Sequence, residues 1–129
     1  MSGKIIGLGG VFIKSKDKTR LNQWYQDIFD ITMEDWGTTF QILQINNEDT
    51  QVFAVFPDSS KYFNEGQSYM INWMVDDLEP LKEKLKAKNI EILGSQFSEY
   101  GKFAWINDPD GNKLELWEPP KIQTNNTIV

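Results

Sequence analysis

The sequence of 129 residues lacks both cysteine and histidine. Without cysteine, disulfide bonds, thiolate metal sites and cysteine nucleophiles are excluded. Without histidine, imidazole is excluded both as a metal ligand and as a general base, which removes catalytic triads and most transition-metal sites. These two absences restrict the possible functions more than the rest of the composition does.

Long apolar runs and clusters of basic residues are missing as well. No stretch is long enough to cross a bilayer, and the start Met-Ser-Gly-Lys is not followed by the apolar core of a signal peptide, so we expect a soluble cytoplasmic protein. Acidic residues outnumber basic ones by 19 to 13, giving a net charge of −6. We therefore expect neither nucleic acid nor a membrane surface as a partner.

What the chain does contain is an ordinary globular mixture with many aromatic rings. One domain is expected from the length, and 40% of the residues are apolar. Aromatic residues reach 13%, which is a large ring surface for so short a chain. These rings suit either a dense core or a lined cavity.

The first half of the chain predicts one helix among four strands. A strand is expected over Ile5–Ser15, and Asp17 is a candidate helix N-cap. The helix has an apolar stripe at helical spacing, formed by Leu21, Trp24, Tyr25, Ile28 and Phe29. Three further strands are expected near Ile31–Trp36, Thr39–Ile45 and Thr50–Phe56.

The second half predicts the same order. A strand over Tyr69–Val75 is followed by Asp77 as a candidate N-cap, and Asn89 ends the helix. The helix stripe consists of Leu78, Leu81 and Leu85. Strands follow over Ile90–Leu93, Lys102–Ile106 and Asn112–Trp117, and the last two are joined by the turn Asp108-Pro109-Asp110-Gly111.

The two halves therefore form a repeat of β-α-β-β-β units. Gly10, Asp17 and Leu21 stand 60 positions before Met70, Asp77 and Leu81. We predict an α+β domain over residues 1–129, with module one at 4–57, a linker at 58–67, module two at 68–120 and a tail at 121–129. One unit alone leaves a sheet face uncovered, so two curved sheets are expected to pair and enclose a cleft, within the chain or across a dimer.

Three segments resemble a known superfamily. LGGVFIKSKDKTRLNQWYQDIFDI is similar to the opening strand and helix of the vicinal oxygen chelate superfamily, MINWMVDDLEPLKEKLKAKNIEI resembles the opening of its second module, and FAWINDPDGNKLELWEPP resembles its closing hairpin. The superfamily includes glyoxalase I, extradiol dioxygenases, and fosfomycin- and bleomycin-resistance proteins. The resemblance implies a pair of βαβββ modules, a ligand cleft between them and a homodimer.

The resemblance also implies four metal-ligand positions. In this chain they hold Gly10, Phe53, Met70 and Glu115, so one ligand of four remains. A catalytic first-row metal needs about three nitrogen, oxygen or sulfur ligands. We therefore predict no cofactor and no tightly bound metal, and only weak, water-mediated binding of Mg²⁺ or Mn²⁺ at Glu115 stays open.

Glu115 is the candidate catalytic or ligand-contacting residue. Strand alternation sends Lys113 and Trp117 to its side and Leu114 and Leu116 to the core. A purely structural role, with the carboxylate bonded to a backbone amide or a lysine, is an equal alternative. Buried among rings without a cation, Glu115 would have a raised pKa and could serve as an acid or base.

The same alternation predicts an aromatic, thioether-rich ligand site. Its candidate residues are Gly10, Phe12, Phe53, Met70, Asn72, Tyr100, Trp105 and Trp117, and Phe103 is expected beside them. Such a lining suits a small apolar or aromatic molecule. Ordinary core packing is the alternative for each single ring.

Three functions follow as hypotheses. The first is a metal-free protein that binds a small organic molecule, similar to the bleomycin-resistance branch. The second is a glyoxalase- or isomerase-type lyase that uses Glu115, with Tyr100 or Asn72, to move a proton. The third is a non-catalytic interaction domain with a vestigial cleft.

Overall fold

The structure is a computed structural model, and it describes residue 3, residues 11–40 and residues 51–120. Two helices, α1 (Lys18–Phe29) and α2 (Leu78–Ala87), pack on a four-stranded sheet. The strands are β1 (Ile71–Met74), β2 (Gly94–Ser98), β3 (Gly101–Asn107) and β4 (Lys113–Glu118). The expected α+β class is confirmed. No helix in these ranges has both the length and the apolar character needed to cross a membrane.

The sheet has the strand order β1-β4-β3-β2. β1 pairs with β4 in parallel, whereas the pairs β2–β3 and β3–β4 are antiparallel. A parallel pair needs a long crossover, and here α2, β2 and β3 lie between the two partners in the chain. The order β-α-β-β-β predicted for the second half is therefore confirmed.

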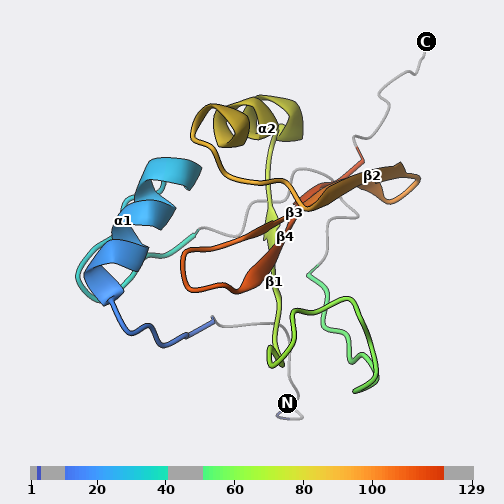
Figure 1. The fold of residues 1–129 in the computed structure, drawn as a ribbon, viewed down its shortest axis with the longest axis horizontal. Coiled ribbons are helices and arrows are strands. Elements are labelled where there is room, and N and C mark those ends of the chain that lie inside the picture. The colour runs from blue at the N-terminus through green and yellow to red at the C-terminus, as the bar shows by residue number, and fades with distance from the viewer. Residues whose placement is uncertain (1–2, 4–10, 41–50, 121–129) are drawn as a thin grey trace.

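One face of the sheet carries the hydrophobic core. Alternate residues of β3 and β4 point to this face, and those side chains are fully buried: Ala104, Ile106, Leu114 and Leu116. They pack with Leu21, Tyr25 and Ile28 of α1 and with Leu78 and Leu85 of α2. Figure 1 shows the two helices together on one side of the sheet and the green chain of residues 51–70 on the other.

The ends of both helices are fixed by hydrogen bonds. Asp17 caps α1 as predicted, since its carboxylate accepts from the backbone N–H of Arg20 at 3.1 Å. α2 ends in a Schellman arrangement, in which Ile90 N–H donates to the Leu85 carbonyl and Asn89 N–H to the Lys86 carbonyl. Asn89 has a φ of 60°, a left-handed conformation that asparagine tolerates, so the predicted stop is confirmed.

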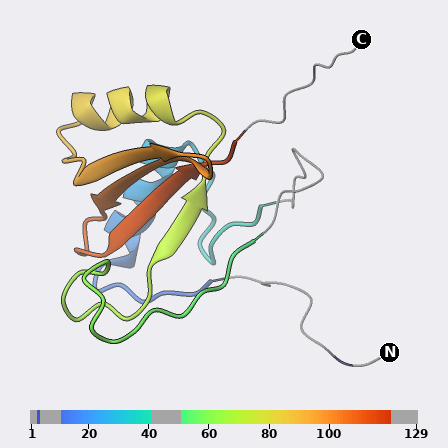
Figure 2. The same cartoon turned by 90° about the vertical axis from the view of Figure 1, so that its right-hand side faces the viewer.

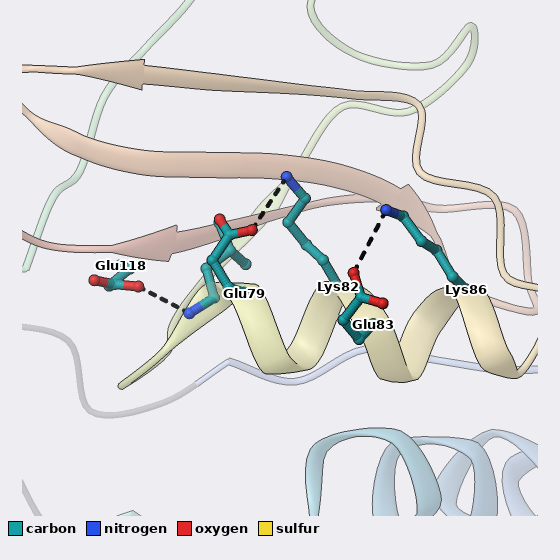
Figure 3. A network of polar contacts seen from close by, with 6 residues as sticks. Glu79, Lys82, Glu83, Lys86 and Glu118 are labelled. Carbon is teal, nitrogen blue, oxygen red and sulfur yellow. Dashed lines mark hydrogen bonds and ion pairs between the residues drawn. The ribbon is translucent and has the colours of Figure 1, made fainter.

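The N-terminus of α2 is capped differently from the prediction. Asp77 holds the N-cap position but makes no side-chain capping bond. Instead, the Glu118 carboxylate at the end of β4 accepts from Leu78 N–H at 2.8 Å (Figure 3). Glu118 lies beside the first turn because β4 runs under α2, and this contact spans 40 positions of sequence.

The strands predicted for the first half do not form within the described residues. Residues 11–15 and 51–56 form no strand, and the segment after α1 contains only an isolated bridge between Glu34 and Gly37. Residues 4–10 and 41–50 of the expected strands lie outside the described ranges. A β-strand requires hydrogen bonds to a neighbouring strand, and an apolar sequence pattern alone does not supply that partner.

In the second half, only one strand is displaced from its prediction. The strand expected at Ile90–Leu93 begins four residues later, as β2 at Gly94. Ile90 and Ile92 instead pack against the core from the connection that follows α2. The tight hairpin pairs Ser98 with Gly101, and this turn sets the register of β2.

The turn between β3 and β4 anchors α1. The buried Asp108 carboxylate accepts from the backbone N–H groups of Asp110 and Asn112, and from the Tyr25 hydroxyl at 3.2 Å. Burial raises the pKa of Tyr25 and the charge of Asp108 raises it further. The predicted turn is confirmed, and the bond from Tyr25 to Asp108 joins α1 to the sheet.

Candidate functional site

Three polar side chains form a row across the sheet on the side opposite the helices. Asn72 of β1 and Trp105 of β3 are both register partners of Glu115 on the central strand β4. Register partners project to the same side of a sheet. We call this side the Glu115 face, and by strand alternation its residues are Asn72, Met74, Phe103, Trp105, Lys113, Glu115 and Trp117.

The Glu115 carboxylate accepts hydrogen bonds from three side chains. Asn72 Nδ2 donates to Oε2 at 2.6 Å, Trp105 Nε1 donates to Oε1 at 2.8 Å, and the Tyr62 hydroxyl also donates to Oε1. All three donors are electrically neutral. Within the described residues, the half-buried carboxylate is held by side-chain N–H and O–H groups, and no hydrogen bond joins it to a backbone amide or a lysine.

Tyr62 reaches Glu115 from the segment 58–67, which was expected only as a linker. Two polar side chains fasten this segment to the sheet. Gln67 exchanges hydrogen bonds with both backbone groups of Lys113, at 2.8 and 3.0 Å. Asn64 Nδ2 donates to the Asn107 side chain at 2.8 Å. The green segment consequently runs past the lower part of the sheet in Figure 2.

The environment of Tyr62 keeps its hydroxyl protonated. Burial raises the pKa of Tyr62, and the hydrogen bond to Glu115 and the charge of that carboxylate raise it further. The hydroxyl also accepts from Trp105 Nε1 at 2.9 Å. At neutral pH this phenol therefore acts as a donor toward Glu115.

Lys113 lies on the same face and contacts two rings. Its Nζ donates to the backbone carbonyl of Tyr62 at 2.6 Å. The ammonium is 4.8 Å from the centre of the Tyr62 ring and 5.9 Å from the centre of the Trp105 ring. Both distances lie within the range of a cation–π contact.

The aromatic side chains of the face form a nearly parallel row. The Phe103 ring is 6.3 Å from Trp105 at an interplanar angle of 9°, and 6.3 Å from Trp117 at 13°. Tyr62 closes one end of this row, with its ring edge-on to Trp105 at 5.9 Å. The result is a half-exposed aromatic surface directly beside the Glu115 carboxylate.

The structure thus gathers part of the predicted site on one face. Asn72, Trp105 and Glu115 are in direct contact, and Trp117 stacks on Phe103. Sequence reasoning missed Tyr62, for which the only signal was an aromatic pair, Tyr62 and Phe63, inside a polar segment.

The other predicted site residues lie elsewhere. Phe12 is 98% exposed and Phe53 is 84% exposed. Met70 is half-buried directly before β1. Tyr100 lies at the tip of the β2–β3 hairpin, 68% exposed, and its backbone carbonyl accepts from Trp117 Nε1 at 2.8 Å. Gly10 lies outside the described residues.

Metal-ligating side chains do not gather in the described part of the chain. There, no group of three or more aspartate, glutamate, histidine or cysteine residues lies close enough to hold an ion. A hollow of about 310 Å³ lies beside α1, and one of about 160 Å³ lies between α2 and the β2–β3 hairpin. Glu115 lines neither hollow, and the cleft expected between two modules stays a prediction.

Comparison with known proteins identifies the fold. No family model matches the sequence, and no curated protein is significantly similar to it. TnmS3, an antibiotic binding protein from Streptomyces sp. CB03234, superimposes with a TM-score of 0.53 at 15% identity, over 93% of this chain and 99% of its own. Lactoylglutathione lyase from Agrobacterium tumefaciens gives 0.50 at 16% identity, over 81% and 87%.

A protein from the mobile metagenome of V. Pseudocholerae is similar as well, with a TM-score of 0.51 at 12% identity, over 88% of this chain and 96% of its own. All three have the fold named by the sequence resemblance. This protein has the vicinal oxygen chelate fold. Because that fold carries several chemistries, the fold alone does not identify the function of this chain.

Proposed function

We propose that this vicinal oxygen chelate protein binds a small apolar or aromatic molecule on the Glu115 face and does so without a tightly held metal ion. The supporting observation is the row of Phe103, Trp105 and Trp117 rings beside a hydrogen-bonded carboxylate. Parallel rings offer stacking surface to a flat ligand, and a few fixed polar groups orient it. The antibiotic-binding role named for TnmS3 is compatible with this proposal.

The donor set around Glu115 argues against a first-row metal ion. Trp105 Nε1 and Asn72 Nδ2 carry hydrogens and have no lone pair free for a cation. The raised pKa of Tyr62 keeps its hydroxyl neutral, so it supplies no phenolate ligand. Of the remaining positions implied by the superfamily, Phe53 and Met70 offer no hard ligand.

We further propose a homodimer. Val52, Phe53 and Val55 in the first half are strongly exposed in the single chain, and a second copy would remove this apolar surface from water. Multi-angle light scattering tests this, and a monomer at micromolar concentration would refute it.

A second candidate is a glyoxalase- or isomerase-type lyase. It is favoured by the Tyr62–Glu115 pair, in which a carboxylate base lies next to a protonated phenol. Glu115 would take the proton from a hydroxyl-bearing carbon beside a carbonyl and return it to the carbonyl carbon, while the hydroxyl proton passes to the former carbonyl oxygen, so atoms balance without a redox partner. Glyoxalase turnover with added Ni²⁺ or Zn²⁺ would favour this candidate over simple binding.

A thermal-shift screen of aromatic compounds, followed by calorimetry, tests the binding function. Glu115→Gln is expected to lower the affinity for a bound compound about 10-fold, because it removes a charged hydrogen-bond acceptor. Trp36→Ala is the matched control, because Trp36 is strongly exposed and lies off the face. Unchanged affinity in Glu115→Gln would contradict the proposal, and a protein that no compound stabilises would favour the interaction domain.

A further inference from the structure

The Glu115 face already holds one cation, and that cation belongs to the chain itself. The Lys113 ammonium lies against the Tyr62 and Trp105 rings. Its one hydrogen bond in the described structure is to the Tyr62 carbonyl. These ring faces are therefore oriented so that a positive charge fits between them.

The carboxylate beside these rings has no ionic partner in the described ranges. The four ion pairs found there involve other residues: Lys18–Asp35, Lys82–Glu79, Lys84–Asp30 and Lys86–Glu83. The hydrogen bonds to Glu115 in these ranges all come from neutral donors. A half-buried carboxylate of this kind gains from a nearby positive charge, because the surroundings screen less than bulk water.

The charge of the whole chain acts in the same direction. With a net charge of −6, the molecule attracts cations and repels anions at long range. An aromatic wall, a carboxylate and an acidic protein together match the chemistry that recognises protonated and quaternary amines.

We infer that the Glu115 face selects an organic cation, an amine group attached to an apolar or aromatic body, whose charge takes the place of the Lys113 ammonium against Tyr62 and Trp105. This inference rests on the proposed binding function and specifies the charge of its ligand. Lys113 is then an internal competitor. Its flexible stem lets the ammonium turn to solvent when the ligand enters.

NMR titration of the Trp105 indole N–H with small probes tests the inference. Choline and its neutral isostere 3,3-dimethylbutan-1-ol differ in charge but hardly in shape, and benzyl alcohol reports neutral aromatic binding. We expect choline to bind about 10-fold more tightly than the isostere. Glu115→Gln should lower the affinity for choline to that for the isostere.

Lys113→Met supplies a gain-of-affinity test that a misfolded variant cannot imitate. It keeps an apolar stem and removes the competing ammonium, so choline affinity should rise at least about 3-fold. Lys102→Met is the matched control, since it removes the same charge from the opposite side of the sheet. An equal rise in choline affinity in both variants would show that only the net charge of the protein matters. That result would overturn the role of Lys113 as an internal competitor.

The outcomes separate the inference from the proposed function. If benzyl alcohol binds and choline binds no better than its isostere, the cation inference is overturned and the binding function stands. If none of the three probes shifts the Trp105 signal at millimolar concentration, both are overturned.

Discussion

Removing the carboxylate of Glu118 should destabilise the protein through the end of helix α2, although Glu118 lies on a strand. Its side chain is 7% exposed and accepts from the N–H of Leu78, which is itself buried. In Figure 3 it lies at the first turn of α2, apart from the Lys82–Glu79 and Lys86–Glu83 pairs.

The expected magnitude follows from three terms. Loss of a helix cap costs about 1 kcal/mol. The charge at the helix N-terminus adds about 0.5 kcal/mol, and the buried N–H left without a partner adds roughly 1 kcal/mol. Removing the carboxylate also removes the free-energy cost of burying its charge, and this offsets part of the destabilisation. We expect Glu118→Ala to lower the free energy of unfolding by about 2 kcal/mol, and Glu118→Gln, which keeps an acceptor oxygen, by about half as much.

Urea unfolding followed by tryptophan fluorescence measures these changes. At an m-value of about 2 kcal/mol/M, Glu118→Ala should lower the midpoint by roughly 1 M. Asp77→Ala is the matched control, because Asp77 holds the N-cap position without a capping bond, and it should cost about 0.5 kcal/mol or less. The reasoning is refuted if Asp77→Ala destabilises the protein as much as Glu118→Ala.

Three further results are expected. Because the folded-state pKa of Tyr25 is raised, its contribution to stability is complete below about pH 10 and is lost as the pH rises above that value. Above about pH 10, the difference in free energy of unfolding between wild type and Tyr25→Phe should fall by about 1.4 kcal/mol per pH unit. A difference that does not change with pH would contradict the burial argument. Gly101→Ala should cost roughly 3 kcal/mol in urea unfolding, since φ is 118° and the added methyl meets the Glu118 carbonyl, whereas Gly111→Ala, with φ 84° and open space, should cost about 1 kcal/mol. Protein purified without chelator should contain far less than one equivalent of metal by mass spectrometry, and near-stoichiometric Ni, Zn, Mn or Fe would contradict the metal-free proposal.

Local sequence patterns were sufficient for much of the fold. The apolar spacing of Leu21, Tyr25 and Ile28 predicted α1, and the alternation around Glu115 predicted which side chains of β4 enter the core. Such patterns depend on residues within a few positions of one another, so no distant partner is needed to interpret them. The same holds for the turn that begins at Asp108.

The site was predictable only in part. Asn72, Trp105 and Glu115 were predicted as site residues, but the strand order and the register that pair both Asn72 and Trp105 with Glu115 were not predicted, because they depend on turn geometry and on pairing between distant strands. The position of Tyr62 does not follow, because its hydroxyl meets Glu115 across 53 positions from a segment without periodicity. Lys113 was predicted on the same side of β4 as Glu115, but its contact with Tyr62 could not be predicted without knowing where the segment 58–67 lies.

The sequence by itself determined the absence of imidazole and thiol chemistry, the second β-α-β-β-β unit and the side of the sheet on which Glu115 lies, because composition and short-range periodicity carry this information. Only the tertiary structure decided that Glu118 caps α2 in place of Asp77, that Tyr62 donates to the Glu115 carboxylate, and that the Lys113 ammonium lies against the Tyr62 ring. Those contacts join residues far apart in the chain, and their geometry exists only once the sheet has brought them together.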